Sequence, residues 1–248
     1  MATTVFQRYE TKFLLTAEQV AALRPIIEEN MEPDPYFREV ICNVYYDTPT
    51  FDLARRSLDH PFYREKVRMR SYETPGPGDR VFFEIKKKVD GIVYKRRAAM
   101  TLAQAEDFAQ GGAPEVDSQI ARELRYTMGL HRLSPKVYLS YRRDSYRVRG
   151  SDLRLTLDTE IRYRFHDLAL GAGPAGELLL PEGETIMEVK TCAGLPLWLL
   201  RRTGEMGIFP ARYSKYGNIY KRHYPALVGA AETKSMGETE NVEKYTVR

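Results

Sequence analysis

The chain has 248 residues, of which 43% are hydrophobic and 29% are charged, and its formal net charge is +4. This length suits one domain with a large core, expected over residues 1–225, followed by a polar tail over 226–248. Its two cysteines, Cys42 and Cys192, have no CxxC or Cys/His spacing, which excludes a disulfide framework and a structural zinc site and predicts a cytoplasmic protein. The longest apolar run, LPLWLL at 195–200, is too short to cross a bilayer.

Alternating apolar and polar residues predict about eight β-strands, separated by turn signals such as PGPGD at 75–79 and VDG at 89–91. In chain order the predicted strands cover residues 5–15, 40–48, 64–72, 79–89, 92–100, 135–147, 152–164 and 184–191.

Helical periodicity is confined to shorter stretches. The first follows Thr16, which we expect to form a capping box with Gln19, and Pro25 is expected to bend or divide this helix. The other predicted helices cover residues 102–109, 118–128, 195–206 and 214–224.

Nearly every predicted strand has one charged face and one apolar face. In 152–164, for example, one parity holds Arg154, Thr156, Asp158, Glu160, Arg162 and Arg164. A solvated sheet surface explains this pattern strand by strand. The faces are rich in arginine, however, and hold few Ser, Thr, Asn or Gln residues, which favours a sheet closed on itself with the charges inside.

A cationic lumen requires a polyanionic occupant, because converging cations repel each other. Arginine forks match phosphate oxygens, so a run of phosphoryl groups is the favoured ligand. Duplex nucleic acid is too wide for a small barrel. Single-stranded nucleic acid remains an alternative, although the 17 tyrosines mostly lie on the parity opposite the cations.

Carboxylates are interspersed among the cations, where they could bind Mn²⁺ or Mg²⁺ or could instead neutralise neighbouring arginines. They are Glu10, Glu84, Asp158, Glu160 and Glu188. The four histidines are scattered without ligand spacing, and the chain has no P-loop. Phosphoryl transfer without a protein nucleophile is therefore the natural hypothesis.

Several ordered motifs together resemble the VTC-type polyphosphate polymerase domain of the triphosphate tunnel (CYTH-like) superfamily. The motifs are RYETKF (8–13), YYDTP (45–49), KVRMRSY (66–72), FEIKKK (83–88), YKRR (94–97), YRRDSY (141–146), LRLTLDTE (153–160), MEVKT (187–191) and RYSKYGN (212–218). The resemblance implies an α+β fold with a closed, eight-stranded antiparallel tunnel that binds triphosphate and polyphosphate with a divalent metal.

The same resemblance implies roles for individual residues. The phosphate-binding cations would be Lys12, Arg68, Arg70, Lys86, Lys95, Arg97, Arg143, Arg154, Lys190 and Lys215. Among them, Arg68, Arg70, Lys86 and Lys215 would also act in catalysis. Glu188 corresponds to the metal-binding glutamate of the family, and Glu10 and Glu160 are further candidate ligands. Lys215 follows Ser214, a good N-cap, so we expect it at a helix start.

One position departs from the hydrolytic relatives, which begin with Glu-x-Glu-x-Lys. Here the frame reads Arg8-Tyr-Glu10-Thr-Lys12, so a cation replaces one potential metal ligand. The expected function is transfer of the terminal phosphoryl group of ATP to pyrophosphate or polyphosphate. The alternatives are a metal-dependent triphosphatase and a non-catalytic module that binds polyphosphate or inositol polyphosphates. A separate membrane-embedded partner is compatible with each of these, and one chain does not define the oligomeric state.

Overall fold

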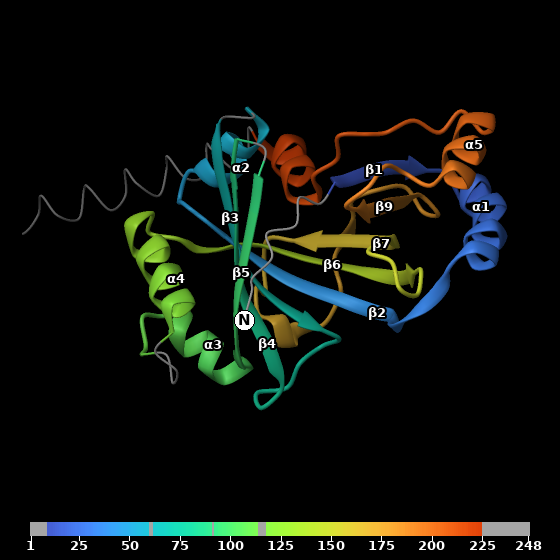
Figure 1. Cartoon of the computed structure of the whole chain (residues 1–248). Coiled ribbons are helices and arrows are strands. Elements are labelled where there is room, and N and C mark those ends of the chain that lie inside the picture. Colours follow the sequence, from blue (N-terminus) through green and yellow to red (C-terminus); the bar gives the residue numbers. More distant parts are fainter. Residues whose placement is uncertain (1–8, 60–61, 91, 114–117, 225–248) are drawn as a thin grey trace, which may run out of the picture. The chain divides into compact units, whose positions relative to one another are not determined.

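The structure is a computed structural model that describes residues 9–59, 62–90, 92–113 and 118–224 (Figure 1). The expected tail at 226–248, Arg8 and His60 lie outside the described residues. The chain contains two compact units, each assembled from separate segments. Among the described residues, the first comprises 9–43, 71–75 and 138–214, and the second comprises 44–59, 62–70, 76–90, 92–113, 118–137 and 215–224. The single domain expected from the sequence stays a prediction.

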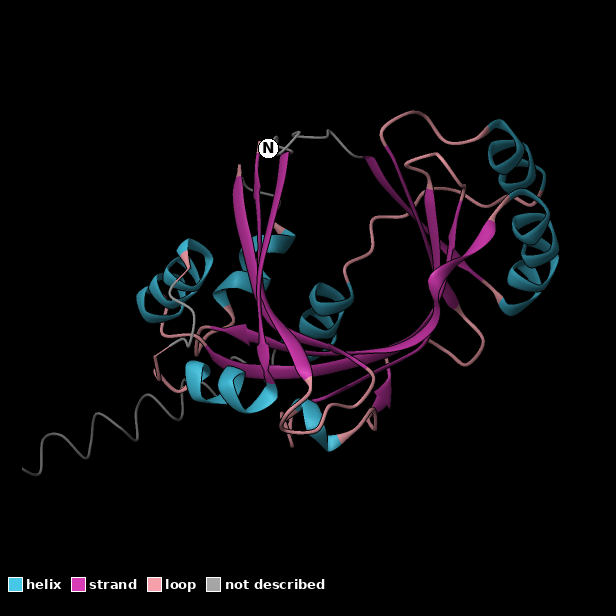
Figure 2. Ribbon diagram, turned by 60° about the horizontal axis from the view of Figure 1, so that its bottom comes forward, coloured by secondary structure: helices cyan, strands magenta, loops and turns pink. Residues whose placement is uncertain are grey.

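The strands form one hydrogen-bonded sheet in the order β1-β9-β7-β6-β2-β3-β4-β5, with the short β8 paired to β7. The strands are β1 (Tyr9–Leu15), β2 (Glu32–Asp47), β3 (Tyr63–Tyr72), β4 (Arg80–Val89), β5 (Ile92–Thr101), β6 (Ser134–Arg147), β7 (Arg154–Arg164), β8 (Glu177–Leu178) and β9 (Thr185–Thr191). All eight predicted strands are present, β2 is longer than expected, and β8 was not predicted. The α+β class is confirmed (Figure 2), whereas closure of the sheet into a tunnel stays a prediction.

Helix α1 (Ala17–Asn30) begins with the predicted capping box. The backbone N–H of Gln19 donates to Thr16 Oγ1, and the backbone N–H of Thr16 donates to Gln19 Oε1. The expectation that Pro25 divides the helix is wrong, because α1 runs through it without a break. Leu23 and Ile27, both fully buried, hold the helix against the core on either side of this proline.

The core of the first unit lies between one face of β1, β7 and β9 and two helices, α1 and α5 (Leu197–Glu205). Phe13, Leu155 and Val189 contribute to it from the strands. Figure 1 shows α1 and α5 together beside β1 and β9. Because side chains alternate along a strand, Lys12, Arg154 and Glu188 point to the opposite face.

The second unit uses the same plan. Val81, Phe83 and Ile85 of β4 are buried, and the ring of Phe108 meets that of Phe83 edge-on at 5.5 Å. Phe108 belongs to α3 (Leu102–Ala109), which packs on β4 and β5 together with α4 (Gln119–Leu130). Residues 215–224 are helical, as expected.

Helix α2 (Asp52–Leu58) was not predicted from the sequence. Its first turn depends on Asp47, whose carboxylate accepts from the backbone N–H groups of Leu53 and Ala54. Asp47 lies outside the helix, so helical periodicity in the sequence gives no sign of this contact.

A β-bulge in β7 corrects the predicted parity of this strand. Ser140 and Arg142 of β6 pair with Arg162 and Thr159, so two steps on β6 match three on β7. The extra residue shifts the alternation by one. Arg162 and Arg164 therefore do not share a face with Arg154, as the sequence pattern had suggested.

Arg164 shows the consequence of this shift. It is 6% exposed, stacks over the Tyr138 ring at 3.6 Å and donates to the carbonyls of Gly173 and Ala175. It is thus a structural residue of the loop before β8.

No helix among the described residues is long and apolar enough to span a membrane.

Candidate functional site

Three lysines of the second unit lie side by side across three strands. Lys66 of β3 is in register with Lys86 of β4, which is in register with Lys95 of β5. Directly opposed residues share a face of the sheet, and like charges in such positions are destabilising. Negative charge nearby would therefore stabilise this lysine row.

The next row supplies one such charge within the protein. Arg68, Glu84 and Arg97 are in register, and Glu84 is 1% exposed. Its carboxylate lies 2.7 Å from Arg68 Nη2, 2.7 Å from Lys95 Nζ and 4.0 Å from Arg70 Nε. One buried glutamate thus serves three of the predicted phosphate-binding cations.

Charge coupling in this cluster shifts two pKa values. Burial by itself raises the pKa of Glu84. The positive charges of Arg68, Arg70 and Lys95 outweigh this effect and bring the pKa down to about 2. Burial, together with Arg68 and Arg70, lowers the pKa of Lys95 to about 8 although Glu84 opposes the shift. Glu84 is therefore ionised near neutral pH, and Lys95 is close to its titration point.

A stacked pair of tyrosines connects this cluster to the helix at 215–224. Arg68 Nη1 donates to the Tyr45 hydroxyl at 3.1 Å, and the Tyr45 ring stacks on Tyr216 at 4.6 Å. The Tyr216 hydroxyl donates to Asp47 Oδ2 at 2.7 Å. Lys215, the half-buried first residue of this helix, is thus anchored through its neighbour.

Tyr45 and Asp47 were absent from the candidate site residues, although their motif, YYDTP, was recognised. Glu84 was expected either to bind a metal or to neutralise neighbouring arginines, and its contacts with Arg68 and Arg70 match the second role. The side chain of Arg97 lies over the Phe82 ring at 4.5 Å. All of the predicted site residues in this unit apart from Lys215 therefore come from one patch of β3, β4 and β5.

The first unit has a second set of cations, arranged in two rows. One row runs Glu10, Lys190, Arg154 and Arg147 across β1, β9, β7 and β6. The adjacent row runs Lys12, Glu188, Thr156 and Ser145 across the same strands. The predicted residues Lys12, Arg154, Glu188 and Lys190 are thus neighbours on one face.

Glu188 lies at the centre of this set and is 7% exposed. Its carboxylate is 2.5 Å from Lys190 Nζ and 3.8 Å from Lys12 Nζ. Lys12 is also 3.0 Å from Glu10 Oε1 and donates to the carbonyl of Tyr213. Two predicted metal ligands, Glu10 and Glu188, therefore share one lysine.

Arg143 is held by a two-pronged ion pair with Asp158. Arg143 Nε and Nη2 donate to the two carboxylate oxygens at 2.6 and 2.8 Å, and Asp158 is fully buried. Burial by itself lowers the pKa of Arg143, but Asp158 raises it well above the ordinary value. Asp158 acts as a counter-ion, the alternative role that the sequence left open. Arg154 is more open, with its nearest carboxylate, Asp34, at 3.9 Å.

The scan of protein families matches the VTC domain over residues 7–224. The chain belongs to the VTC domain family. The family resemblance inferred from the motifs is thereby confirmed.

The VTC domain also resembles solved structures at low sequence identity. A candidate adenylate cyclase from Bacillus halodurans has a TM-score of 0.53 and 14% identity, and the match covers 86% of this chain and 96% of that one. A candidate adenylyl cyclase from Hippeastrum, with a dominant triphosphatase activity, has a TM-score of 0.49 and 16% identity, covering 84% and 92%. The first likeness shows a shared fold and nothing more specific. No curated protein matches the chain.

The carboxylates of the VTC domain fit a divalent metal only in part. Among the described residues, no group of three or more His, Cys, Asp or Glu side chains converges. Glu188 and Glu10 do approach the same lysine, and Mg²⁺ is often held by one or two carboxylates plus substrate phosphates. The pair therefore suits a metal that arrives with a phosphate ligand.

Glu160, the third predicted ligand, is not brought to this pair. It lies at the β7 bulge with a φ of 46°, and its carboxylate contacts Arg142 Nε at 3.2 Å. Arg142 and Arg143 are consecutive in β6 and so point to opposite faces. Glu160 therefore lies on the face opposite Glu188, with a side chain that is 51% exposed.

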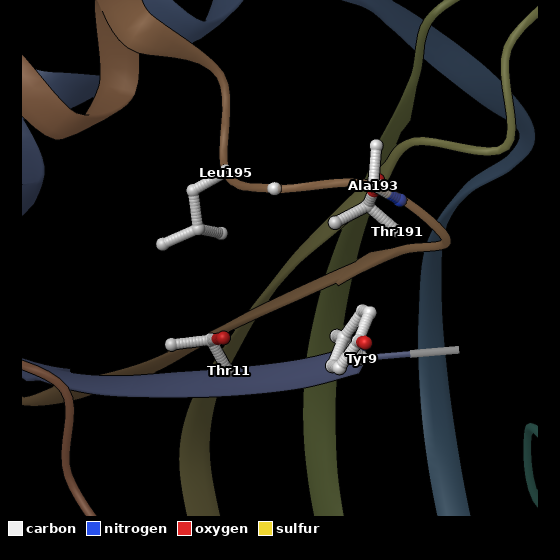
Figure 3. Close-up of a pocket in the computed structure, with 6 residues that line it drawn as sticks. Tyr9, Thr11, Thr191, Ala193 and Leu195 are labelled. Carbon is white, nitrogen blue, oxygen red and sulfur yellow. Dashed lines mark hydrogen bonds between the residues drawn. The ribbon is translucent and has the colours of Figure 1, made fainter. Parts of the chain in front are cut away.

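The VTC domain also has a hollow of about 400 Å³ on the face of β1 and β9 that lies opposite Lys12 and Glu188. In Figure 3, Tyr9 and Thr11 lie on one side of this hollow and Leu195 on the other. None of its six lining residues is charged. The hollow is therefore unsuited to a polyanion and separate from the cation rows.

Proposed function

We propose that this VTC domain is a cytoplasmic polyphosphate polymerase that uses ATP. It would transfer the terminal phosphoryl group of ATP to pyrophosphate or to a growing polyphosphate chain, in a basic, metal-dependent tunnel. The observation that carries the proposal is the lysine row Lys66, Lys86 and Lys95, which opposes three like charges in consecutive strands. A linear chain of phosphates is a ligand whose regularly spaced negative charges match such a row.

The internal ion pairs support a binding step based on exchange of partners. Arg68 contacts Glu84 and Arg143 contacts Asp158, so both guanidinium groups are already oriented before a ligand arrives. Such preorganisation reduces the side-chain entropy lost on binding. A phosphate oxygen can then accept hydrogen bonds from these guanidinium groups without having to fix their conformation.

Phosphoryl transfer depends mainly on positioning and on stabilising charge on the transferred group. Arg68, Arg70 and Lys86 would neutralise charge on the oxygens of the transferred group. Lys215 would add a further cation from the helix start, held by the stacking of Tyr216 on Tyr45. A Mn²⁺ or Mg²⁺ ion held by Glu188 and Glu10 would supply additional charge neutralisation on the phosphates.

The test is to incubate the purified protein with ATP and Mn²⁺ and to separate the products on a gel. Polymer should form, and Lys86→Met should reduce its yield by roughly 100-fold. Lys87→Met is the matched control, because Lys87 is the next residue of β4 and contacts Glu123 on the opposite face at 2.7 Å. This control variant should retain the yield of the wild type.

Three outcomes would contradict the proposal. Release of inorganic phosphate without polymer would indicate the triphosphatase. Tight polyphosphate binding without turnover would indicate the non-catalytic module. Equal yields from the Lys86 and Lys87 variants would show that the lysine row takes no part in the reaction.

A further inference from the structure

A buried hydroxyl in the first unit has no protein partner among the residues that the structure describes. Thr156 is 8% exposed, and its Oγ1 makes no hydrogen bond there. A buried polar group without a partner costs free energy, and most such groups in folded proteins are satisfied. Such a hydroxyl is able to bond to a ligand, which a Val of the same shape could not do.

The neighbours of Thr156 in the sheet show on which face its hydroxyl lies. It lies in register with Glu188 on one side and Ser145 on the other. Leu155 and Leu157, its neighbours along β7, point into the core. Thr156 therefore projects from the charged face.

The surrounding charges favour an anion over a cation as the ligand. The nearest carboxylates are engaged, because Glu188 contacts Lys190 and Asp158 is paired with Arg143. A hydroxyl can donate a hydrogen bond to an anionic oxygen, and a donor to a charged acceptor makes one of the stronger hydrogen bonds in proteins.

We propose that Thr156 is a subsite residue whose hydroxyl donates a hydrogen bond to a phosphate oxygen of the bound chain. This inference rests on the phosphate-binding part of the proposed function and does not require polymerisation. The hydroxyl would be a neutral hydrogen-bond donor beside the cations, and it lies in the same row as Glu188.

The variant Thr156→Val separates this role from a structural one, because the two effects have opposite signs. Without ligand, the substitution removes an unsatisfied buried hydroxyl and keeps the side-chain shape, so the midpoint of thermal unfolding should be unchanged or higher. Binding of tripolyphosphate, measured by calorimetry in EDTA, should weaken by about 10-fold or more.

Two further variants serve as controls. Thr156→Ser keeps the hydroxyl and should bind tripolyphosphate within about 3-fold of the wild type, since a single lost methyl group changes little else. Thr159→Val alters a half-buried threonine on the other face of β7 and should bind as the wild type does.

The proposal is wrong if Thr156→Val binds tripolyphosphate as tightly as the wild type, or if Thr156→Ser is as weak as the Val variant. A loss seen only with Mn²⁺ would overturn it as well, because the hydroxyl would then serve the metal. Failure of wild-type binding in EDTA would reject the subsite itself. If binding follows the expected pattern but no polymer forms from ATP, the polymerase proposal fails and the subsite stands.

Discussion

Glu84 is the residue on which the cation cluster of the second unit depends most, and Glu84→Gln tests this directly. The substitution keeps the size of the side chain and removes the charge that Arg68, Arg70 and Lys95 share. The three cations would then repel each other without a buried counter-ion. We expect a less stable free protein that binds polyanions more tightly.

The magnitude follows from the pKa of Glu84. A fall from the ordinary value of 4.5 to about 2 means that the folded protein favours the ionised form. At about 1.4 kcal/mol per unit, the charge contributes roughly 3 kcal/mol to the free energy of unfolding. This contribution is present above pH 4.5 and is lost as the pH falls toward 2, because the carboxyl group then becomes protonated in the folded state as well.

The assay is urea unfolding of the wild type and Glu84→Gln over a range of pH. The two free energies of unfolding should differ by about 3 kcal/mol at pH 7 and converge as the pH approaches 2. Glu182→Gln, at an exposed position, is the control and should change little. Tripolyphosphate should raise the unfolding midpoint of Glu84→Gln more than that of the wild type, because the negative charge of Glu84 no longer competes with phosphate for Arg68 and Arg70. Equal stabilities at pH 7, or a difference that does not vary with pH, would refute this account of Glu84.

Two further predictions concern Lys95 and Asp47. Burial lowers the pKa of Lys95 to about 8, so its charge is lost as the pH rises from 7 to 9, and the affinity for tripolyphosphate should fall more steeply in the wild type than in Lys95→Arg, as measured by calorimetry. Equal pH dependence in both proteins would contradict this assignment. Asp47→Asn replaces an acceptor oxygen with a donor where Ala54 N–H and the Tyr216 hydroxyl are bonded, and should lower the free energy of unfolding by about 3 kcal/mol. Asp52→Asn, whose partner Arg55 is exposed, should cost less than about 1 kcal/mol in the same denaturant titration, and a comparable loss in both variants would show that Asp47 has no special role.

The elements of this fold could largely be predicted from the sequence, because their signals are local. Alternation within 64–72 and 79–89 located β3 and β4 to within about a residue at each end. The Thr16 and Gln19 pair marked the start of α1, as a capping box does. Helix α2 was missed because its first turn is capped by Asp47, several residues before the helix begins.

The family and the cation-bearing motifs also followed from the sequence. The partners of those cations did not, because ion pairs join residues on different strands. Nothing in FEIKKK by itself indicates that Glu84 contacts Arg68 and Lys95.

The sequence by itself determined where eight of the strands lie and, outside the bulge in β7, which parity of each strand is charged. The tertiary structure decided which of these residues meet. Strand register places Lys66, Lys86 and Lys95 in one row, and the bulge in β7 moves Glu160 to the face opposite Glu188. Alternation along a strand is a property of neighbouring residues, whereas register and bulges arise from hydrogen bonds between strands far apart in the chain.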